Sequence, residues 1–194
     1  MVIKFSFVLL LLTGALGAVA QKIKMEVMMG EKKIGEINAE KVTKDKAAEY
    51  SMKSDVKTTM VFTVMVNIVT KTYWYDGNLT VSRAIRTSNM PGQDENTGLE
   101  IKGKQYQLTK NGKISQMDYP INLCVTNLYF QEPIKDTAAF SEIQGMYLTI
   151  TNLGNHQYQV KQPNGKKNIY FYVNGKLQKI ETVVAGNNVV FLVK

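Results

Sequence analysis

Cysteine and histidine are almost absent from this 194-residue chain, which contains one residue of each, Cys124 and His156. A single cysteine excludes an intramolecular disulfide, so packing of the core must stabilise the fold. Two soft ligands in one chain cannot complete a zinc site of cysteines and histidines, and we expect no bound metal. Cys124 follows Leu123, and we interpret it as a small buried apolar residue. His156 lies in a turn-like stretch and is interpreted as a surface residue.

Sequence motifs for nucleotides and nucleophilic catalysis are also missing. The chain has no G-x-S-x-G elbow, no glycine loop that cradles phosphate and no dinucleotide fingerprint. We therefore expect no cofactor and no nucleophilic enzyme.

Long apolar runs are lacking after the first twenty residues. The most apolar later stretch, Met60–Val69, is only half the length that a membrane-spanning helix needs, about 20 residues. Residues 1–20 themselves read as a signal peptide, with Lys4, an apolar run over Phe5–Leu16 and the small-x-small sequence Ala18-Val19-Ala20. We expect an exported protein, periplasmic or extracellular, with residues 21–194 as one β-rich domain and no transmembrane helix after cleavage.

Acidic residues are fewer than basic ones, 16 against 24, which gives a net charge of +8. The lysines are scattered and mostly flank predicted strands, where they keep strand edges soluble. We interpret them as a solvated surface, and together with the export signal they disfavour nucleic acid as a partner.

Turn dipeptides separate short runs rich in Val, Ile, Thr, Tyr and Phe. Asp76-Gly77, Asn111-Gly112 and Asn174-Gly175 suit the positive φ angles of tight hairpins. Residues between such turns favour a pleated, half-buried surface. The pattern predicts a mostly β fold: a single, strongly curved antiparallel sheet, an open half-barrel-like meander, with one or two short helices.

The stretch between Pro120 and Pro133 interrupts the meander. A short helix is expected over residues 121–131, where Asn122 could act as the cap, and a further helical turn over residues 136–139. The long run Lys57–Tyr75 is expected to be one strand, with a bulge or a break into two strands as the alternative.

Aromatic residues and the ten methionines suggest an apolar concave face. Such a face would bind an acyl chain or another apolar ligand, and ordinary core packing is the alternative. The candidate ligand-binding residues are Phe62, Trp74, Tyr129, Phe130, Tyr170 and Tyr172.

Two glutamates are the candidate polar residues. Glu132 and Glu142 lie beside Phe130 and Phe140, where burial could raise a carboxyl pKa. A pair of carboxylates is enough for some hydrolases, and the alternative is that each one accepts structural hydrogen bonds. No residue is assigned as catalytic.

Several motifs resemble an uncharacterised family of exported Bacteroidetes proteins of this length. They are Ile34-Gly35-Glu36-Ile37, Tyr75-Asp76-Gly77-Asn78-Leu79, Leu128-Tyr129-Phe130-Gln131-Glu132-Pro133, Ser141-Glu142-Ile143-Gln144-Gly145 and Pro163-Asn164-Gly165 to Asn174-Gly175. The resemblance implies export but no activity. More distantly, the layout is similar to the open half-barrel of the periplasmic lipoprotein carriers LolA and LolB, which hold acyl chains.

Three functions follow as hypotheses. The first is a non-catalytic envelope protein that binds a hydrophobic ligand, a lipid or a lipid-modified partner in its curved sheet. The second is a structural or assembly factor that contacts an envelope protein through a surface patch or strand edge. The third, a carboxylate-pair hydrolase, requires Glu132 and Glu142 to share an open cleft, with side chains within about 10 Å of each other.

Overall fold

A computed structural model describes residues 17–59 and 63–194 of the chain. These residues form one 14-stranded antiparallel sheet with the order β8-β7-β6-β5-β4-β3-β2-β1-β14-β13-β12-β11-β10-β9. The elements are β1 (Val19–Met29), β2 (Lys32–Lys44), β3 (Ala47–Thr59), β4 (Thr63–Tyr75), β5 (Asn78–Ser88), β6 (Glu95–Lys102), β7 (Gln105–Lys110), β8 (Lys113–Asp118), the 3-10 helix η1 (Val125–Tyr129), β9 (Ala138–Ser141), β10 (Met146–Gly154), β11 (Gln157–Lys161), β12 (Lys167–Val173), β13 (Lys176–Val184) and β14 (Asn187–Val193).

The sheet is a meander because almost every pair of neighbouring strands is joined by a tight turn. Asp76 and Gly77 both have positive φ, as do Asn111 and Gly112. Two such residues in succession build the turn whose twist matches that of the flanking strands. Among the described strands, only β1 and β14 pair without being consecutive, and this pairing joins the first and the last of these strands in one sheet. The predicted curved, open antiparallel sheet is therefore confirmed.

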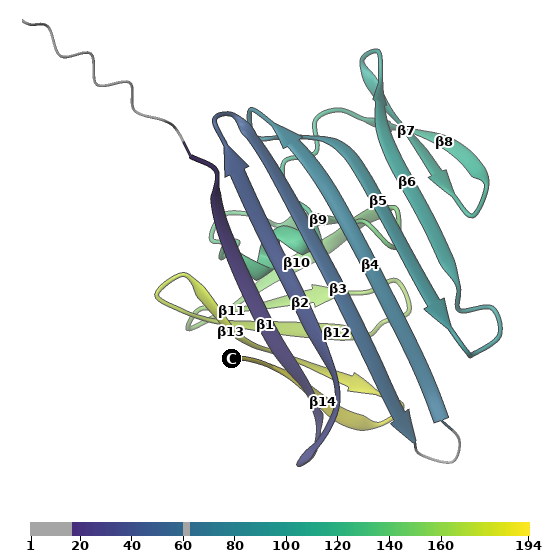
Figure 1. Ribbon diagram of the computed structural model, residues 1–194, viewed down its shortest axis with the longest axis vertical. Coiled ribbons are helices and arrows are strands. Elements are labelled where there is room, and N and C mark those ends of the chain that lie inside the picture. Colours follow the sequence, from purple (N-terminus) through teal and green to yellow (C-terminus); the bar gives the residue numbers. More distant parts are fainter. Residues whose placement is uncertain (1–16, 60–62) are drawn as a thin grey trace, which may run out of the picture.

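The sheet curls over but does not close. In Figure 1, β10 to β13 lie behind β1 to β4 and cross them, which gives a front layer and a back layer. β8 and β9 are the two edges of the sheet. The chain passes from one edge to the other through residues 119–137, which we call the internal segment.

The apolar core consists of two clusters on the concave side. One gathers residues of β1, β2 and β9 to β14, and the other residues of β3 to β7 together with Phe140 of β9. The internal segment contributes to both clusters: Leu123, Leu128 and Tyr129 belong to the first, and Ile121 and Cys124 to the second. It therefore lies between the layers as part of the core. Cys124 is buried, as expected.

Helical structure is shorter than the sequence predicts. Among the described residues, the only helix is η1, five residues within the expected range 121–131. The further helical turn expected over residues 136–139 is wrong, because Ala138 already begins β9, whose Phe140 and Ala139 pair with β10. The expectation of a single strand over Lys57–Tyr75 is wrong, because β3 ends at Thr59 and pairs with β4. The alternative, a break into two strands, is confirmed.

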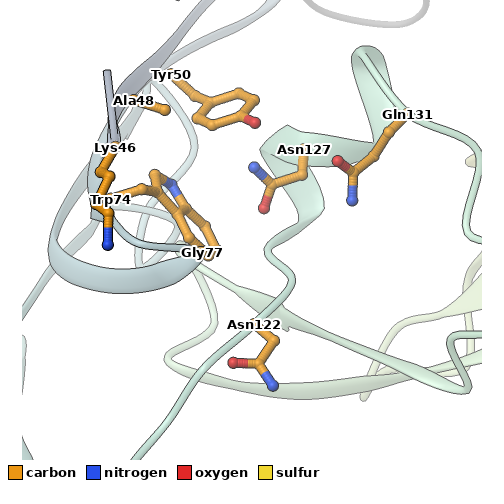
Figure 2. Close-up of a pocket in the computed structure, with 8 residues that line it drawn as sticks. All are labelled: Lys46, Ala48, Tyr50, Trp74, Gly77, Asn122, Asn127 and Gln131. Carbon is orange, nitrogen blue, oxygen red and sulfur yellow. The ribbon is translucent and has the colours of Figure 1, made fainter. Parts of the chain in front are cut away.

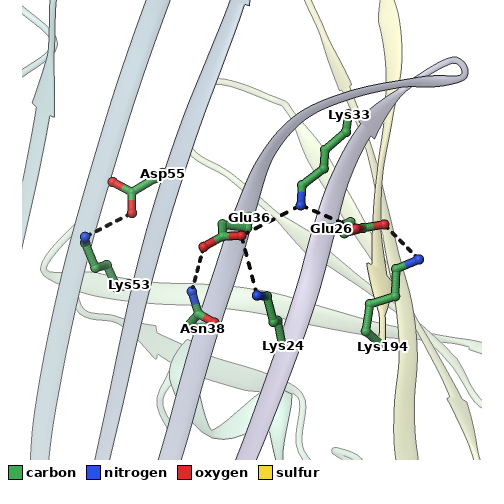
Figure 3. Close-up of polar contacts among 8 residues, drawn as sticks. All are labelled: Lys24, Glu26, Lys33, Glu36, Asn38, Lys53, Asp55 and Lys194. Carbon is green, nitrogen blue, oxygen red and sulfur yellow. Dashed lines mark hydrogen bonds and ion pairs between the residues drawn. The ribbon is translucent and has the colours of Figure 1, made fainter.

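The outer face of β1 to β3 carries several pairs of oppositely charged side chains (Figure 3). Glu26 lies 3.3 Å from Lys33 and 2.8 Å from Lys194, which ties the last residue of the chain to β1. Glu36 contacts Lys24 and Lys33, at 3.8 and 3.7 Å. These side chains are partly exposed, so each pair contributes little stability, about 0–1 kcal/mol. Their alternation with inward-facing apolar residues fixes which face of the sheet is buried.

The N-terminal strand begins before the expected cleavage point. Val19 and Ala20 pair with Thr43 and Val42 of β2. The signal peptide over residues 1–20 stays a prediction, because residues 1–16 lie outside the described part. Within the described ranges, no helix has the length and apolar character needed to cross a bilayer.

Candidate functional site

The concave face carries a small pocket between the front layer and the internal segment. Its volume is about 250 Å³. The front layer supplies aromatic and small residues and the internal segment supplies carboxamides, as Figure 2 shows. The lining residues are Lys46, Ala48, Tyr50, Trp74, Gly77, Asn122, Asn127 and Gln131.

Strand pairing places the two aromatic rings side by side. Tyr50 of β3 and Trp74 of β4 point to the concave face, and Ala48 pairs directly with Trp74. The small Ala48 side chain leaves room beside the indole. The Tyr50 and Trp74 ring centroids are 6.0 Å apart in an edge-on arrangement, which aromatic pairs prefer. The indole Nε1 donates to Thr72 Oγ1 at 2.9 Å, so the polar atom of Trp74 already has a partner.

The internal segment turns its amides toward these rings. Asn127 is fixed by η1, because its Oδ1 accepts a hydrogen bond from the Cys124 backbone N–H at 2.6 Å. Phe130 packs edge-on against Tyr50, with centroids 5.7 Å apart. The Gln131 backbone N–H donates to the Asn127 carbonyl at 3.1 Å, which holds Gln131 at the end of the helical turn. Asn122 and Gln131 are exposed, so they form the solvent side of the pocket.

The pocket contains one charged group, the Lys46 ammonium. It lies 3.3 Å from Asp76 Oδ1, in the neighbouring hairpin turn. A second lysine, Lys41, lies over the Tyr50 ring, with its Nζ 5.3 Å from the centroid. Among the described residues, neither a carboxylate nor a histidine lines the pocket.

The aromatic candidates predicted from the sequence have separate places. Trp74 lines the pocket and Phe130 supports it through Tyr50. Tyr129, Tyr170 and Tyr172 are buried in the first core cluster, away from the pocket lining. Phe62 lies outside the described residues. Whether any of these residues binds a ligand stays a prediction.

The Tyr172 hydroxyl shows how the back layer holds the internal segment. It donates to the Leu128 carbonyl at 2.6 Å, and both groups are buried. Burial raises the pKa of Tyr172 well above its ordinary value, with smaller contributions from Glu132 and two neighbouring tyrosines. Tyr172 therefore stays neutral and remains a donor at physiological pH.

Glu142 is a buried carboxylate beneath η1. Its Oε1 accepts a hydrogen bond from the Thr126 backbone N–H at 3.0 Å. Burial raises the pKa of Glu142, and hydrogen bonds from Thr126, Val125 and its own backbone partly offset this effect. These are the contacts of a carboxylate that satisfies the free N–H groups at the start of a helical turn.

Glu132 is bonded to the back layer instead. Its Oε1 accepts from the Tyr158 hydroxyl at 2.7 Å and lies 2.8 Å from His156 Nδ1. Burial tends to raise the pKa of Glu132, but these two hydrogen bonds outweigh it and hold the pKa below its ordinary value. Glu132 and Glu142 thus have separate partners, and neither lines a described pocket.

A second hollow, about 370 Å³, lies on the outer face over β5 to β7. Gly98 lies at the bottom of this hollow, and the Arg83 guanidinium packs across it. Arg83 pairs with Glu100 at 3.6 Å. The described residues contain no group of three or more His, Cys, Asp or Glu side chains that could hold a metal.

Comparison with known proteins places the chain in a family. Residues 25–194 match the family described as DUF6134, a domain of unknown function. The chain belongs to the DUF6134 family. No curated protein matches this DUF6134 chain. A solved structure that resembles it is a β-barrel-like protein of domain of unknown function DUF1849 from Brucella abortus. The two chains are 8% identical, with a TM-score of 0.48 over 89% of this chain and 95% of the other.

The expected membership of a family without known activity is confirmed at this level. Neither comparison tests a Bacteroidetes origin or a likeness to LolA and LolB. Sequence reasoning missed most of the DUF6134 pocket: Tyr50, Lys46, Asn127 and Gln131 were not singled out. Asn122 was considered only as a helix cap, and that expectation is wrong because Cys124 is the N-cap of η1. The available signal was the set of amides within and beside the predicted helix.

Proposed function

We propose that this DUF6134 domain is a non-catalytic binding protein that takes one ring of a neutral saccharide into the pocket beside Trp74. The observation that carries the proposal is the division of the lining into aromatic rings on one wall and carboxamides on the other. Aromatic faces pack against the apolar faces of sugar rings, and a carboxamide both donates to and accepts from hydroxyl groups.

Charge and size support this ligand class. The only charged lining residue, Lys46, is paired with Asp76, so the site does not demand an anion. Typical pockets for drug-sized ligands measure roughly 300–1,000 Å³, and this pocket is smaller, about 250 Å³. That favours a single ring over a long acyl chain. The absence of a carboxylate or histidine from the lining favours binding over hydrolysis.

The apolar-ligand hypothesis requires free space on the concave face of the sheet. The internal segment fills the space between the layers, with Ile121, Leu123 and Leu128 in the core. An acyl chain on the concave face would have to displace them. We also propose that the domain works outside the cytoplasm, which rests on the signal-peptide pattern of residues 1–20.

Trp74 is the only tryptophan of the chain, so its fluorescence reports on the pocket directly. We expect N-acetylglucosamine or its β-1,4-linked disaccharide to change this fluorescence saturably. A Kd on the order of 1 mM corresponds to about −4 kcal/mol. Removing one amide in Gln131→Ala should weaken binding about two- to tenfold, from a net hydrogen bond of about 0.5–1.5 kcal/mol.

Gln116→Ala, at an exposed position of β8 outside the pocket, is the matched control and should leave the Kd unchanged. The proposal fails if a panel of neutral mono- and disaccharides gives no saturable change, or if Gln131→Ala and Asn122→Ala bind like the unmodified protein. A saturable change with palmitate alone would favour the apolar ligand instead.

A further inference from the structure

The only histidine of the chain occupies a backbone position that disfavours it. Asn155 and His156 form the two-residue turn between β10 and β11, with φ of 48° and 58°. Four other two-residue turns with positive φ at both positions place glycine second: Asp76-Gly77, Asn111-Gly112, Asn174-Gly175 and Ala185-Gly186. Glycine adopts this conformation without steric cost, whereas other residues pay for it. A side chain other than glycine at such a strained position points to a role for that side chain.

The imidazole of His156 reaches the internal segment. Its Nδ1 lies 2.8 Å from Glu132 Oε1, and the Tyr158 hydroxyl bonds the same oxygen at 2.7 Å. The His156 side chain is 63% exposed, whereas that of Glu132 is 3% exposed. The imidazole therefore covers a nearly buried carboxylate on its solvent side.

Glu132 directly follows one lining residue of the pocket and one residue that supports its wall. Gln131 lines the pocket, and Phe130 packs on Tyr50. Tyr172 fixes the Leu128 carbonyl from the same layer, and the Tyr172 backbone N–H donates to the His156 carbonyl at 3.0 Å. The back layer thus forms hydrogen bonds with the internal segment on both sides of Phe130 and Gln131.

We infer that His156, acting through Glu132, is a positioning residue that holds Gln131 in the pocket. This inference rests on the proposed function for its effect on ligand affinity, but not for its effect on Gln131 itself. The hydrogen bond between the imidazole and the Glu132 carboxylate fixes the residue that directly follows Gln131. A hydrogen bond to a carboxylate is stronger than one between neutral groups, so its loss leaves Gln131 less firmly held.

A second hydrogen bond supports the same carboxylate. Tyr158 has its pKa raised to about 12, chiefly by burial and then by Glu132, so its hydroxyl stays a donor to Glu132. The hydrogen bonds from Tyr158 and His156 hold the pKa of Glu132 below its ordinary value.

Two glycine substitutions in the same turn separate the side chain from the backbone. His156→Gly removes the imidazole and relieves its positive φ, and Asn155→Gly relieves the neighbouring φ but keeps the imidazole. Both variants should fold, because the other turns already contain glycine. The readouts are amide exchange and side-chain NMR signals of Gln131 without ligand, and the Kd for N-acetylglucosamine.

We expect Gln131 of Asn155→Gly to exchange at the rate seen in the unmodified protein and to keep the same side-chain signals. Gln131 of His156→Gly should exchange faster, with shifted signals, and this variant should bind about threefold more weakly. If Gln131 behaves identically in His156→Gly and Asn155→Gly, the inference is overturned. If Gln131 changes as expected in His156→Gly but no saccharide binds any variant, positioning by His156 stands and the proposed function fails.

Discussion

Truncating Leu128 tests whether the internal segment is a built-in part of the core. Leu128 is fully buried in the first core cluster, and its carbonyl is held by Tyr172. Leu→Ala substitutions at such sites cost about 2–5 kcal/mol, because the lost transfer energy is joined by the energy of the cavity that remains. We expect Leu128→Ala to lose a large part of a total stability of about 5–15 kcal/mol.

The loss should lower Tm by about 4–20 °C, since 1 kcal/mol shifts Tm by about 2–4 °C in a domain of this size. Urea unfolding followed by Trp74 fluorescence measures the free energy of unfolding. Ile134→Ala is the matched control on the same segment, because Ile134 is 67% exposed, and it should change stability by less than about 0.5 kcal/mol. A cost below about 1 kcal/mol for Leu128→Ala would refute the reasoning, because the segment would then not fill the concave face.

Three further predictions concern Glu142, Gly35 and Cys124. The pKa of Glu142 is raised in the folded state. Above about pH 4.5 the folded protein therefore keeps a proton on Glu142 that the unfolded chain has released. The free energy of unfolding consequently falls as the pH rises toward and through the folded-state pKa. In urea unfolding, the free energy of unfolding of Glu142→Gln should rise relative to that of the unmodified protein as the pH goes from 4 to 8. A difference between the two proteins that does not change with pH would contradict the raised pKa. Gly35→Ala should lower the free energy of unfolding by about 1–3 kcal/mol or more. The added Cβ would lie 2.3 Å from the Asp55 carbonyl oxygen and 2.8 Å from Val56 Cα. An unchanged Tm in calorimetry would argue against this close approach of β2 to β3. Burial and the nearby Glu142 raise the pKa of the Cys124 thiol, so Ellman's reagent should label it only after unfolding, and rapid labelling of the folded protein would contradict its place in the core.

Much of the sheet can be predicted from the sequence because its turns have a strong local signal. Asp76-Gly77 and Asn174-Gly175 mark hairpins that the structure contains. The boundary between β3 and β4 carries no such signal, because the three residues between Thr59 and Thr63 are Met60, Val61 and Phe62. The many β-branched residues around them therefore predicted one long strand.

The pocket is harder to predict because its walls are far apart in the sequence. Tyr50 and Trp74 meet through the pairing of β3 with β4, and Asn127 reaches them only because the internal segment turns back under the sheet. Aromatic content alone could not separate Trp74, at the pocket, from Tyr170 and Tyr172, in the core. All three are buried, and the tertiary fold alone decides that Trp74 lies beside an open space.

NMR mapping of a bound saccharide on the isotope-labelled domain tests the account most directly. As N-acetylglucosamine or its disaccharide is added, we predict shifts in the side-chain amide signals of Asn122, Asn127 and Gln131 and in the indole signal of Trp74, with Tyr170 unaffected. Shifts centred on the buried tyrosines of the back layer, or none at millimolar saccharide, would contradict a binding site between the aromatic wall and the internal segment.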